Sequence, residues 1–135
     1  MIYSLAIAVP RNTAKAAPVD TELEVHPGVV TKVDVLIPAR CAGLLHVQVI
    51  RNLVHVWPQY EDQSFSGDNT HWSFPEEYPV ADLPYSFTVR CWNLDDTFQH
   101  TAYIALSVLP RDSAAGGGML GGFVEMFGKL ARGEL

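Results

Sequence analysis

The sequence predicts an all-β protein, an antiparallel β-sandwich or small jelly-roll-like barrel of about seven or eight strands, followed by an amphipathic C-terminal helix. Short runs alternate apolar and polar side chains, Pro, Gly, Asn and Asp separate these runs, and several runs carry charges on one side. A strand side that carries charges faces solvent, and one solvent-facing side is typical of antiparallel sheets. The 135 residues, 48% of them apolar, suffice for one domain with its own core.

Each strand is predicted from its own alternation. In residues 3–9, Tyr3, Leu5 and Ile7 share one side, Ser4 and Ala6 share the other, and a proline ends the run. Residues 51–52 suggest a tight hairpin turn, whereas residues 58–84 form a long excursion rich in aromatic residues and proline. The predicted strands cover residues 3–9, 21–25, 30–38, 44–50, 53–58, a short stretch near 71–74, 85–92 and 100–110.

The end of the chain differs from the predicted β domain of residues 1–110. Residues 111–118, RDSAAGGG, have the composition of a hinge, and residues 119–135 place apolar side chains on one helical face. Three glycines in this helix each weaken it by about 1 kcal/mol, so it needs a surface to pack against. That surface is its own β domain, a neighbouring subunit or, least favoured because the polar face carries few basic residues, a membrane. The predicted contact residues are Met119, Leu120, Phe123, Val124, Met126, Phe127 and Leu130.

Charge and termini narrow the class of protein. The net charge is −6, with 6 basic and 12 acidic residues in positions 1–110 and 3 of each in positions 111–135. An acidic domain is not expected to bind nucleic acid by covering phosphates. The first apolar run lacks a basic segment before it and no run is long enough to span a bilayer, so we expect synthesis in the cytoplasm. Whether Cys41 and Cys91 pair stays open.

Asn93, Asp95, Asp96 and His100 form the strongest candidate for chemistry. An Asn-x-Asp…His stretch is similar to the one that supplies the first histidine of a blue-copper site. Such a site also needs a thiolate and a second imidazole, which are absent after His100. Asn and Asp at these positions are more typical of a turn, because their side chains bond the nearby backbone.

The remaining polar residues do not form a recognisable active site. His46, His55 and His71 lack the close His-x-His pairing of cupins. Neighbouring carboxylates on a strand point to opposite faces, and no nucleophile elbow or phosphate-binding glycine motif is present. We therefore expect no catalytic residues, no metal, no cofactor and no enzyme activity.

Aromatic residues concentrate in the excursion. We expect them first as a plug at one end of the sandwich, next as an intersubunit contact, and last as a glycan-binding face. The residues proposed for the interface or the glycan face are Trp57, Tyr60, Trp72, Phe74 and Tyr78.

Residues 20–110 carry features that mark a family resemblance: the HVWP stretch, the GD turn, and WN-x-DD…H followed by a last strand. In these features the chain resembles small β-sandwich virion accessory proteins of tailed phages. The resemblance implies a capsid decoration (cement) protein or another virion accessory protein, located in the virion. Its partners would be itself, as a homotrimer, and a major capsid or other virion protein. The alternatives are a metal-binding β protein, cupredoxin-like or cupin-like, and a glycan-binding or cell-surface-binding module.

Overall fold

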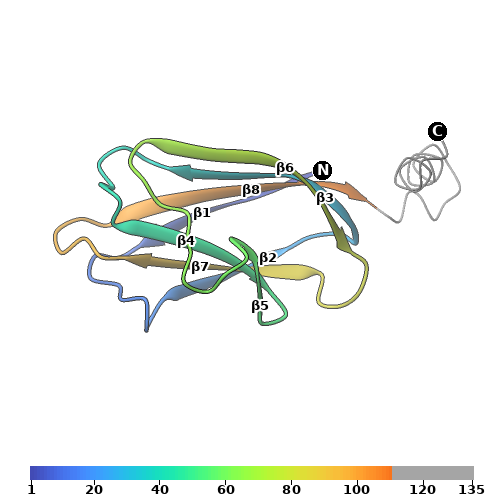
Figure 1. The fold of residues 1–135 in the computed structure, drawn as a ribbon, viewed down its shortest axis with the longest axis horizontal. Helices are drawn as coiled ribbons and strands as arrows, with labels where there is room; N and C mark the ends of the chain where they lie inside the picture. The colour runs from blue at the N-terminus through green and yellow to red at the C-terminus, as the bar shows by residue number, and fades with distance from the viewer. Residues whose placement is uncertain (111–135) are drawn as a thin grey trace, which may run out of the picture.

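The computed structural model describes residues 1–110, which fold into two four-stranded antiparallel sheets packed face to face (Figure 1). The predicted hinge, 111–118, and the predicted helix, 119–135, lie outside the described residues. The first sheet contains, in spatial order, β1 (Ile2–Val9), β8 (His100–Pro110), β3 (Gly28–Ile37) and β6 (Thr70–Val80). The second sheet contains β2 (Val19–Glu24), β7 (Ser86–Asn93), β4 (Leu45–Arg51) and β5 (Val54–Trp57).

The predicted all-β sandwich is therefore confirmed, with eight strands. The inward-facing residues of both sheets form one core in which Val33, Leu45, Phe87, Val89 and Leu106 are fully buried. Each such side chain contributes about 1.5–3 kcal/mol of transfer free energy. Among the described residues, no helix is long and apolar enough to cross a membrane.

Strand β6 corrects the prediction of one short strand near 71–74. It runs for 11 residues and contains Pro75 and Pro79, residues that normally argue against a strand. Because β6 is the last strand of its sheet, it pairs on one side only, with β3. The missing N–H groups of the prolines therefore do not interrupt a central ladder.

The turn between β4 and β5 confirms the predicted hairpin near residues 51–52. Its two central residues, Asn52 and Leu53, both have positive φ angles, 52° and 66°. This pair of conformations is that of a type I′ turn, whose twist matches that of a β-hairpin. Both cysteines are free and buried.

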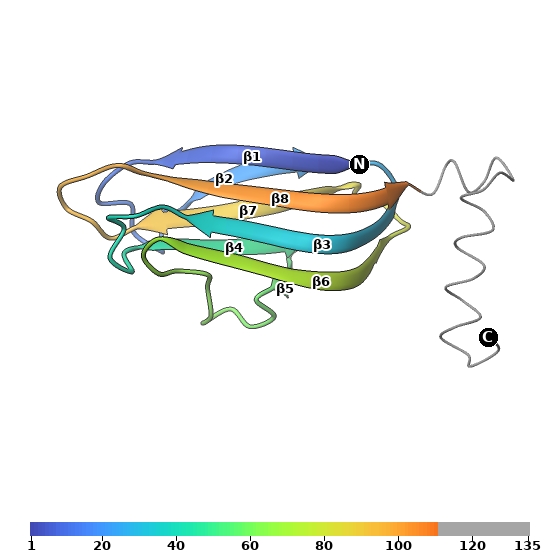
Figure 2. The ribbon, with the colours of Figure 1, turned by 90° about the horizontal axis from the view of Figure 1, so that it is seen from above.

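The first residue and the end of β8 lie at the same end of the sandwich. Figure 2 looks onto the first sheet and shows β1 beginning beside the position where β8 ends. The N-terminal ammonium of Met1 donates to the carbonyl of Val108 at 2.8 Å, and the N–H of Val108 donates to the carbonyl of Met1 at 2.7 Å.

Candidate functional site

The outer face of the first sheet is the candidate functional site. Directly paired residues of neighbouring strands share a face, so the register defines rows across this surface. In the half formed by β1 and β8, most outward side chains are small, and among residues 1–110 no segment crosses this face (Figure 2). The two central rows consist of Ala6, Tyr103, Leu36 and His71, and of Ser4, Ala105, Asp34 and Ser73.

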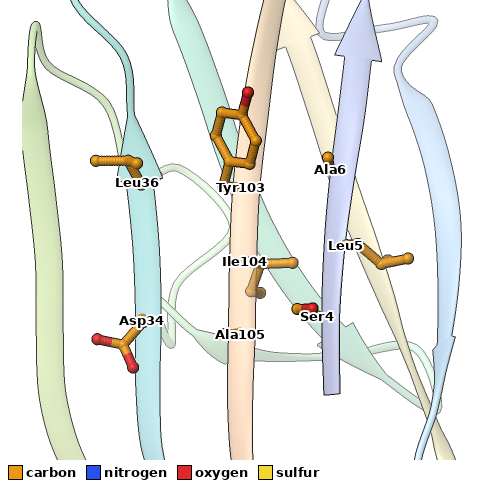
Figure 3. A pocket seen from close by; sticks show the side chains of 8 residues that line it. All are labelled: Ser4, Leu5, Ala6, Asp34, Leu36, Tyr103, Ile104 and Ala105. Carbon is orange, nitrogen blue, oxygen red and sulfur yellow. The ribbon is translucent and has the colours of Figure 1, made fainter. Parts of the chain in front are cut away.

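Small residues beside large ones create a shallow hollow in this face. The hollow has a volume of about 240 Å³, and the small residues Ser4 and Ala6 on β1 and Ala105 on β8 lie beside the larger side chains of Tyr103 on β8 and Leu36 on β3 (Figure 3). Tyr103 is 43% exposed and Leu36 39% exposed. We call the outward residues of β1 and of the middle of β8 the contact face: Ile2, Ser4, Ala6, Ala8, Tyr103 and Ala105.

The free edge of β1 adjoins the contact face. Met1 and Val108 exchange both main-chain hydrogen bonds. Because antiparallel pairs alternate, the odd-numbered residues of β1 bond β8, and the N–H and C=O groups of the even-numbered residues point away from it. Strand β1 contains no charged residue and no proline. An edge of this kind lacks the devices that normally prevent pairing with another chain.

The charges of this outer face are grouped on β3 and β6. Asp34 lies 3.0 Å from the Nε2 of His71 and 3.7 Å from the Nζ of Lys32. Burial by itself would raise the pKa of Asp34, but hydrogen bonds to Ser73 and His71, together with the charge of Lys32, hold it below its usual range. The face thus has a charged half and an uncharged half.

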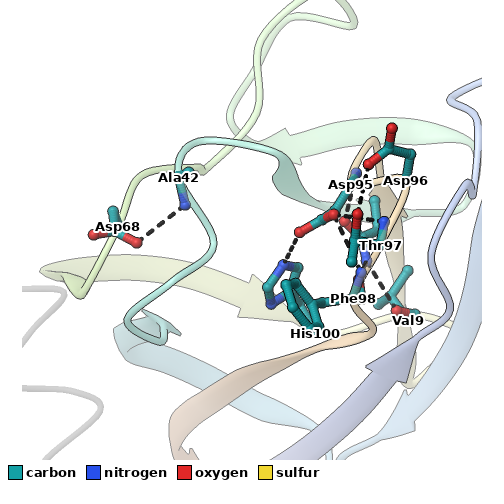
Figure 4. A network of polar contacts seen from close by, with 9 residues as sticks. Val9, Ala42, Asp68, Asp95, Asp96, Thr97, Phe98 and His100 are labelled. Carbon is teal, nitrogen blue, oxygen red and sulfur yellow. Dashed lines mark hydrogen bonds and ion pairs between the residues drawn. The ribbon is translucent and has the colours of Figure 1, made fainter.

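The Asn93–His100 segment forms a polar clamp at the end of the sandwich where β7 ends and β8 begins (Figure 4). Asp95 accepts hydrogen bonds through Oδ1 from the N–H groups of Thr97 at 2.8 Å and Phe98 at 3.2 Å. Its Oδ2 lies 2.8 Å from the Nε2 of His100. The N–H of Thr97 first, and His100 next, hold the pKa of Asp95 below its usual value.

Asn93 extends this clamp to β1. Its Oδ1 accepts the N–H of Asp95 at 3.0 Å, and its Nδ2 donates to the carbonyls of Val9 at 3.2 Å and Phe98 at 3.0 Å. These bonds are the turn chemistry that the sequence indicates, and they join β7, β8 and β1. Asp96 is exposed and accepts only the hydroxyl of Thr97, at 2.8 Å.

The other histidines lie apart from this clamp. His46 stacks on Trp92, with ring centroids 5.0 Å apart, and its Nδ1 contacts the hydroxyl of Ser64 at 2.8 Å. Burial, and after it the charge of Lys15, lowers the pKa of His46. His55 has a buried Nδ1 without a hydrogen-bond partner among residues 1–110. Within residues 1–110, no three His, Cys, Asp or Glu side chains are grouped in a way that would hold a metal ion.

Neither cysteine is placed to act as a nucleophile. Burial, with a smaller effect from Asp20, raises the pKa of Cys91 to about 12. Burial also raises the pKa of Cys41. A thiol in these surroundings stays protonated and is correspondingly unreactive.

The aromatic residues of the excursion lie in separate groups, some buried in the core and others exposed. Trp57 is 5% exposed, stacks on Phe87 and contacts Tyr78, so it belongs to the core and is not available to a partner or a glycan. Trp72 and Phe74 contact Phe65 in a second group. Tyr60 is 61% exposed and Trp72 is 41% exposed. The five proposed residues therefore do not form one aromatic face.

The sequence contained one signal for the contact face. The small residues Ser4, Ala6 and Ala8 share one side of the first strand, and this alternation is visible in the sequence. Their neighbours, Tyr103 and Ala105, come from the last strand, and only the register brings them together. The predicted tail contacts, Met119 to Leu130, lie outside the described residues.

Comparisons with known proteins give a likeness to a solved structure. No protein-family model matches the chain, and no curated protein matches it. The fold is similar to the crystal structure of PliG from Aeromonas hydrophila, a periplasmic lysozyme inhibitor of g-type lysozyme. The likeness covers 80% of this chain and 84% of that chain, at 12% sequence identity and a TM-score of 0.41. A likeness at this level says nothing about what this chain binds.

Proposed function

We propose that this protein is a non-enzymatic structural protein that binds another protein through the contact face and the free edge of β1. The observation that carries the proposal is the uncharged, proline-free edge of β1 beside a row of small, exposed side chains. Edge strands without charges or prolines pair readily with other chains, and small side chains permit close approach.

The area of the outer face of the first sheet is too small for a stable interface by itself. Four strands of about nine residues, spaced about 4.8 Å apart and rising about 3.3 Å per residue, give a flat area of roughly 500–600 Å². A stable protein interface usually buries about 800 Å² on each partner. The face alone falls short of this value, so the edge of β1 and further segments of the chain must add to the contact.

The partner that we propose is a virion shell. The resemblance of residues 20–110 to virion accessory proteins of tailed phages favours a capsid decoration protein, and the net charge of −6 favours a protein partner over nucleic acid. In this proposal copies of the chain form a homotrimer on a major capsid or other virion protein. Burial of apolar area across subunit boundaries then stabilises the shell.

Two substitutions on β1 test this proposal. Ala6→Lys places a charge in the contact face, and Ser4→Pro removes an edge N–H that does not bond β8. We expect each variant to reduce the occupancy of purified shells at least tenfold while the thermal unfolding midpoint changes little. Glu24→Lys, on the exposed outer face of the second sheet, is the control and should leave occupancy unchanged. Unchanged occupancy in both β1 variants would rule out this surface.

A further inference from the structure

A second hollow lies where the described chain ends. Strand β8 finishes at Pro110, and the preceding residue, Leu109, lines a groove of about 420 Å³ on the outer face of the first sheet. Val29 pairs with both Leu109 and Pro79, so three apolar side chains form one row along its floor. We call this the exit groove, lined by Val29, Thr31, Pro75, Glu76, Glu77, Pro79 and Leu109.

The exit groove is separate from the contact face. It lies over β3, β6 and the last residues of β8, whereas the contact face lies over β1 and the middle of β8, so the two share no lining residue. Its floor also depends on a glycine, because a Cβ atom at Gly28 would collide with the carbonyl oxygen of Leu109. The close approach of β3 to the end of β8 therefore places Leu109 beside Val29.

The rim of the exit groove carries the exposed carboxylate of Glu77, whereas the carboxylate of Glu76 points toward Trp57 between the two sheets. The carboxylate of Glu76 accepts the indole N–H of Trp57 at 2.9 Å and the N–H of Glu77 at 2.9 Å. Glu77 is exposed, and neither glutamate forms an ion pair within residues 1–110. A segment that fills this groove should therefore be apolar on one side and basic beside it.

The sequence of residues 119–130 is apolar on one helical face and carries one acidic and one basic residue, Glu125 and Lys129. Its apolar residues recur at helical spacing from Met119 to Leu130, and Lys129 lies within it and Arg132 just beyond it. The nine residues from Pro110 to Met119 reach up to about 30 Å, and a twelve-residue helix is about 18 Å long. The groove extends over roughly four residues of strand, about 13 Å, so the segment has both the reach and the length to cover it.

We propose that residues 119–130 of the same chain pack their apolar stripe into the exit groove, with Lys129 facing Glu77. The attachment point favours the same chain over a second copy. Because Leu109 is part of the groove and the segment starts ten residues later, its effective concentration at the groove is in the millimolar range. Packing against the sheet supplies the support that a helix with three internal glycines needs.

Cysteine crosslinking in the full-length chain tests this packing. In the double variant Pro79→Cys/Phe123→Cys we expect a disulfide within one chain to form at least tenfold faster than in Glu24→Cys/Phe123→Cys. The control places the thiol on the outer face of the second sheet. The natural cysteines are buried and give little background. Equal rates in both variants, or a product that joins two chains and forms faster at higher protein concentration, would overturn the proposal.

A charge exchange tests the predicted ion pair separately. Glu77→Lys should slow the Pro79→Cys/Phe123→Cys crosslink by about two- to fivefold, because surface ion pairs contribute roughly 0.2–1 kcal/mol. Adding Lys129→Glu to that variant should restore the rate. If the rate stays unchanged in Glu77→Lys, the assigned orientation of the segment is wrong. Shell occupancy is a different measurement on a different surface, so the two proposals fail independently.

Discussion

The outer faces of the two sheets differ in how far other parts of the described chain cover them. On the second sheet, Trp92 points outward from β7 and is only 4% exposed, because Lys15 lies 5.5 Å above its ring and His46 stacks beside it. On the first sheet, Tyr103 points outward from β8 and is 43% exposed. Both residues lie on interior strands of their sheets, so the difference comes from what covers each face.

The second sheet is covered by the chain itself. Gln48 points outward from β4 but is 1% exposed, since its Nε2 donates to the carbonyls of Glu61 at 2.9 Å and Gln63 at 2.7 Å in the following loop. The remaining outward residues of this sheet are mostly charged or hydroxylated, and Arg90 pairs with Asp20. Residues 1–110 provide no such cover for the first sheet. The second outer face therefore contributes to stability, and the first is the face that we propose for binding.

Two aromatic truncations test this difference and should give the largest change in free energy of unfolding. Trp92→Ala should cost about 3–5 kcal/mol in free energy of unfolding, because it removes a buried ring. Tyr103→Ala should cost less than about 1 kcal/mol, because the ring is already largely in water. Urea unfolding of both variants measures the two losses. Equal losses would mean that the first face is covered in the full-length protein by residues beyond 110.

Truncation of a buried polar side chain should have the next largest effect on the free energy of unfolding. Gln48→Ala removes the donor from two carbonyls and leaves them partly buried, which should cost about 2 kcal/mol. Ser4→Ala, at an exposed outward position of β1, is the comparison and should leave the unfolding free energy nearly unchanged. Amide hydrogen exchange in residues 58–65 should rise in Gln48→Ala. Unchanged exchange there would show that Gln48 does not hold this loop.

The Arg90–Asp20 pair should contribute less to the free energy of unfolding than Gln48 does. Its two contacts, 2.9 and 3.0 Å, are bidentate, but both side chains are partly exposed. We expect a coupling energy of about 0.5–1 kcal/mol from a double-mutant cycle with Arg90→Ala and Asp20→Ala at low salt. In 1 M NaCl, where the screening length is about 3 Å, the coupling should shrink. A coupling that does not depend on salt would indicate that packing of the Arg90 stem dominates.

The clamp that joins the two sheets should lose its contribution to stability in acid. Because the native pKa of Asp95 is lowered, its stabilisation is present above the unfolded value of about 3.9 and is lost as the pH falls through the native pKa. Asp95→Asn should therefore show a shallower fall of unfolding free energy below about pH 4 than the natural chain. Chemical unfolding at a series of pH values measures this slope. Identical slopes would exclude Asp95 from the acid response.

Sequence patterns predicted elements well where alternation was regular. Strands β1, β7 and β8 were visible because their apolar side chains alternate without interruption. The length of β6 was missed because Pro75 and Pro79 argue against a strand unless it is known to be an edge. The burial of Trp57 agrees with the core role expected first for the aromatic residues of the excursion. The sequence could not single out Trp57 among them, because its contact with Phe87 spans 30 positions of sequence.

The sequence by itself determined most strands and the turn at Asn93–Asp95, because each depends on residues close together in the chain. It also determined that an acidic segment, residues 1–110, precedes a neutral one. The tertiary structure alone decided which outward faces are open. Ala6, Tyr103 and Leu36 form one row although they come from the first, last and third strands, and the loop after β5 covers one sheet and leaves the other bare. Alternation specifies the two sides of a strand, but only the pairing of distant strands specifies which sides meet and which stay exposed.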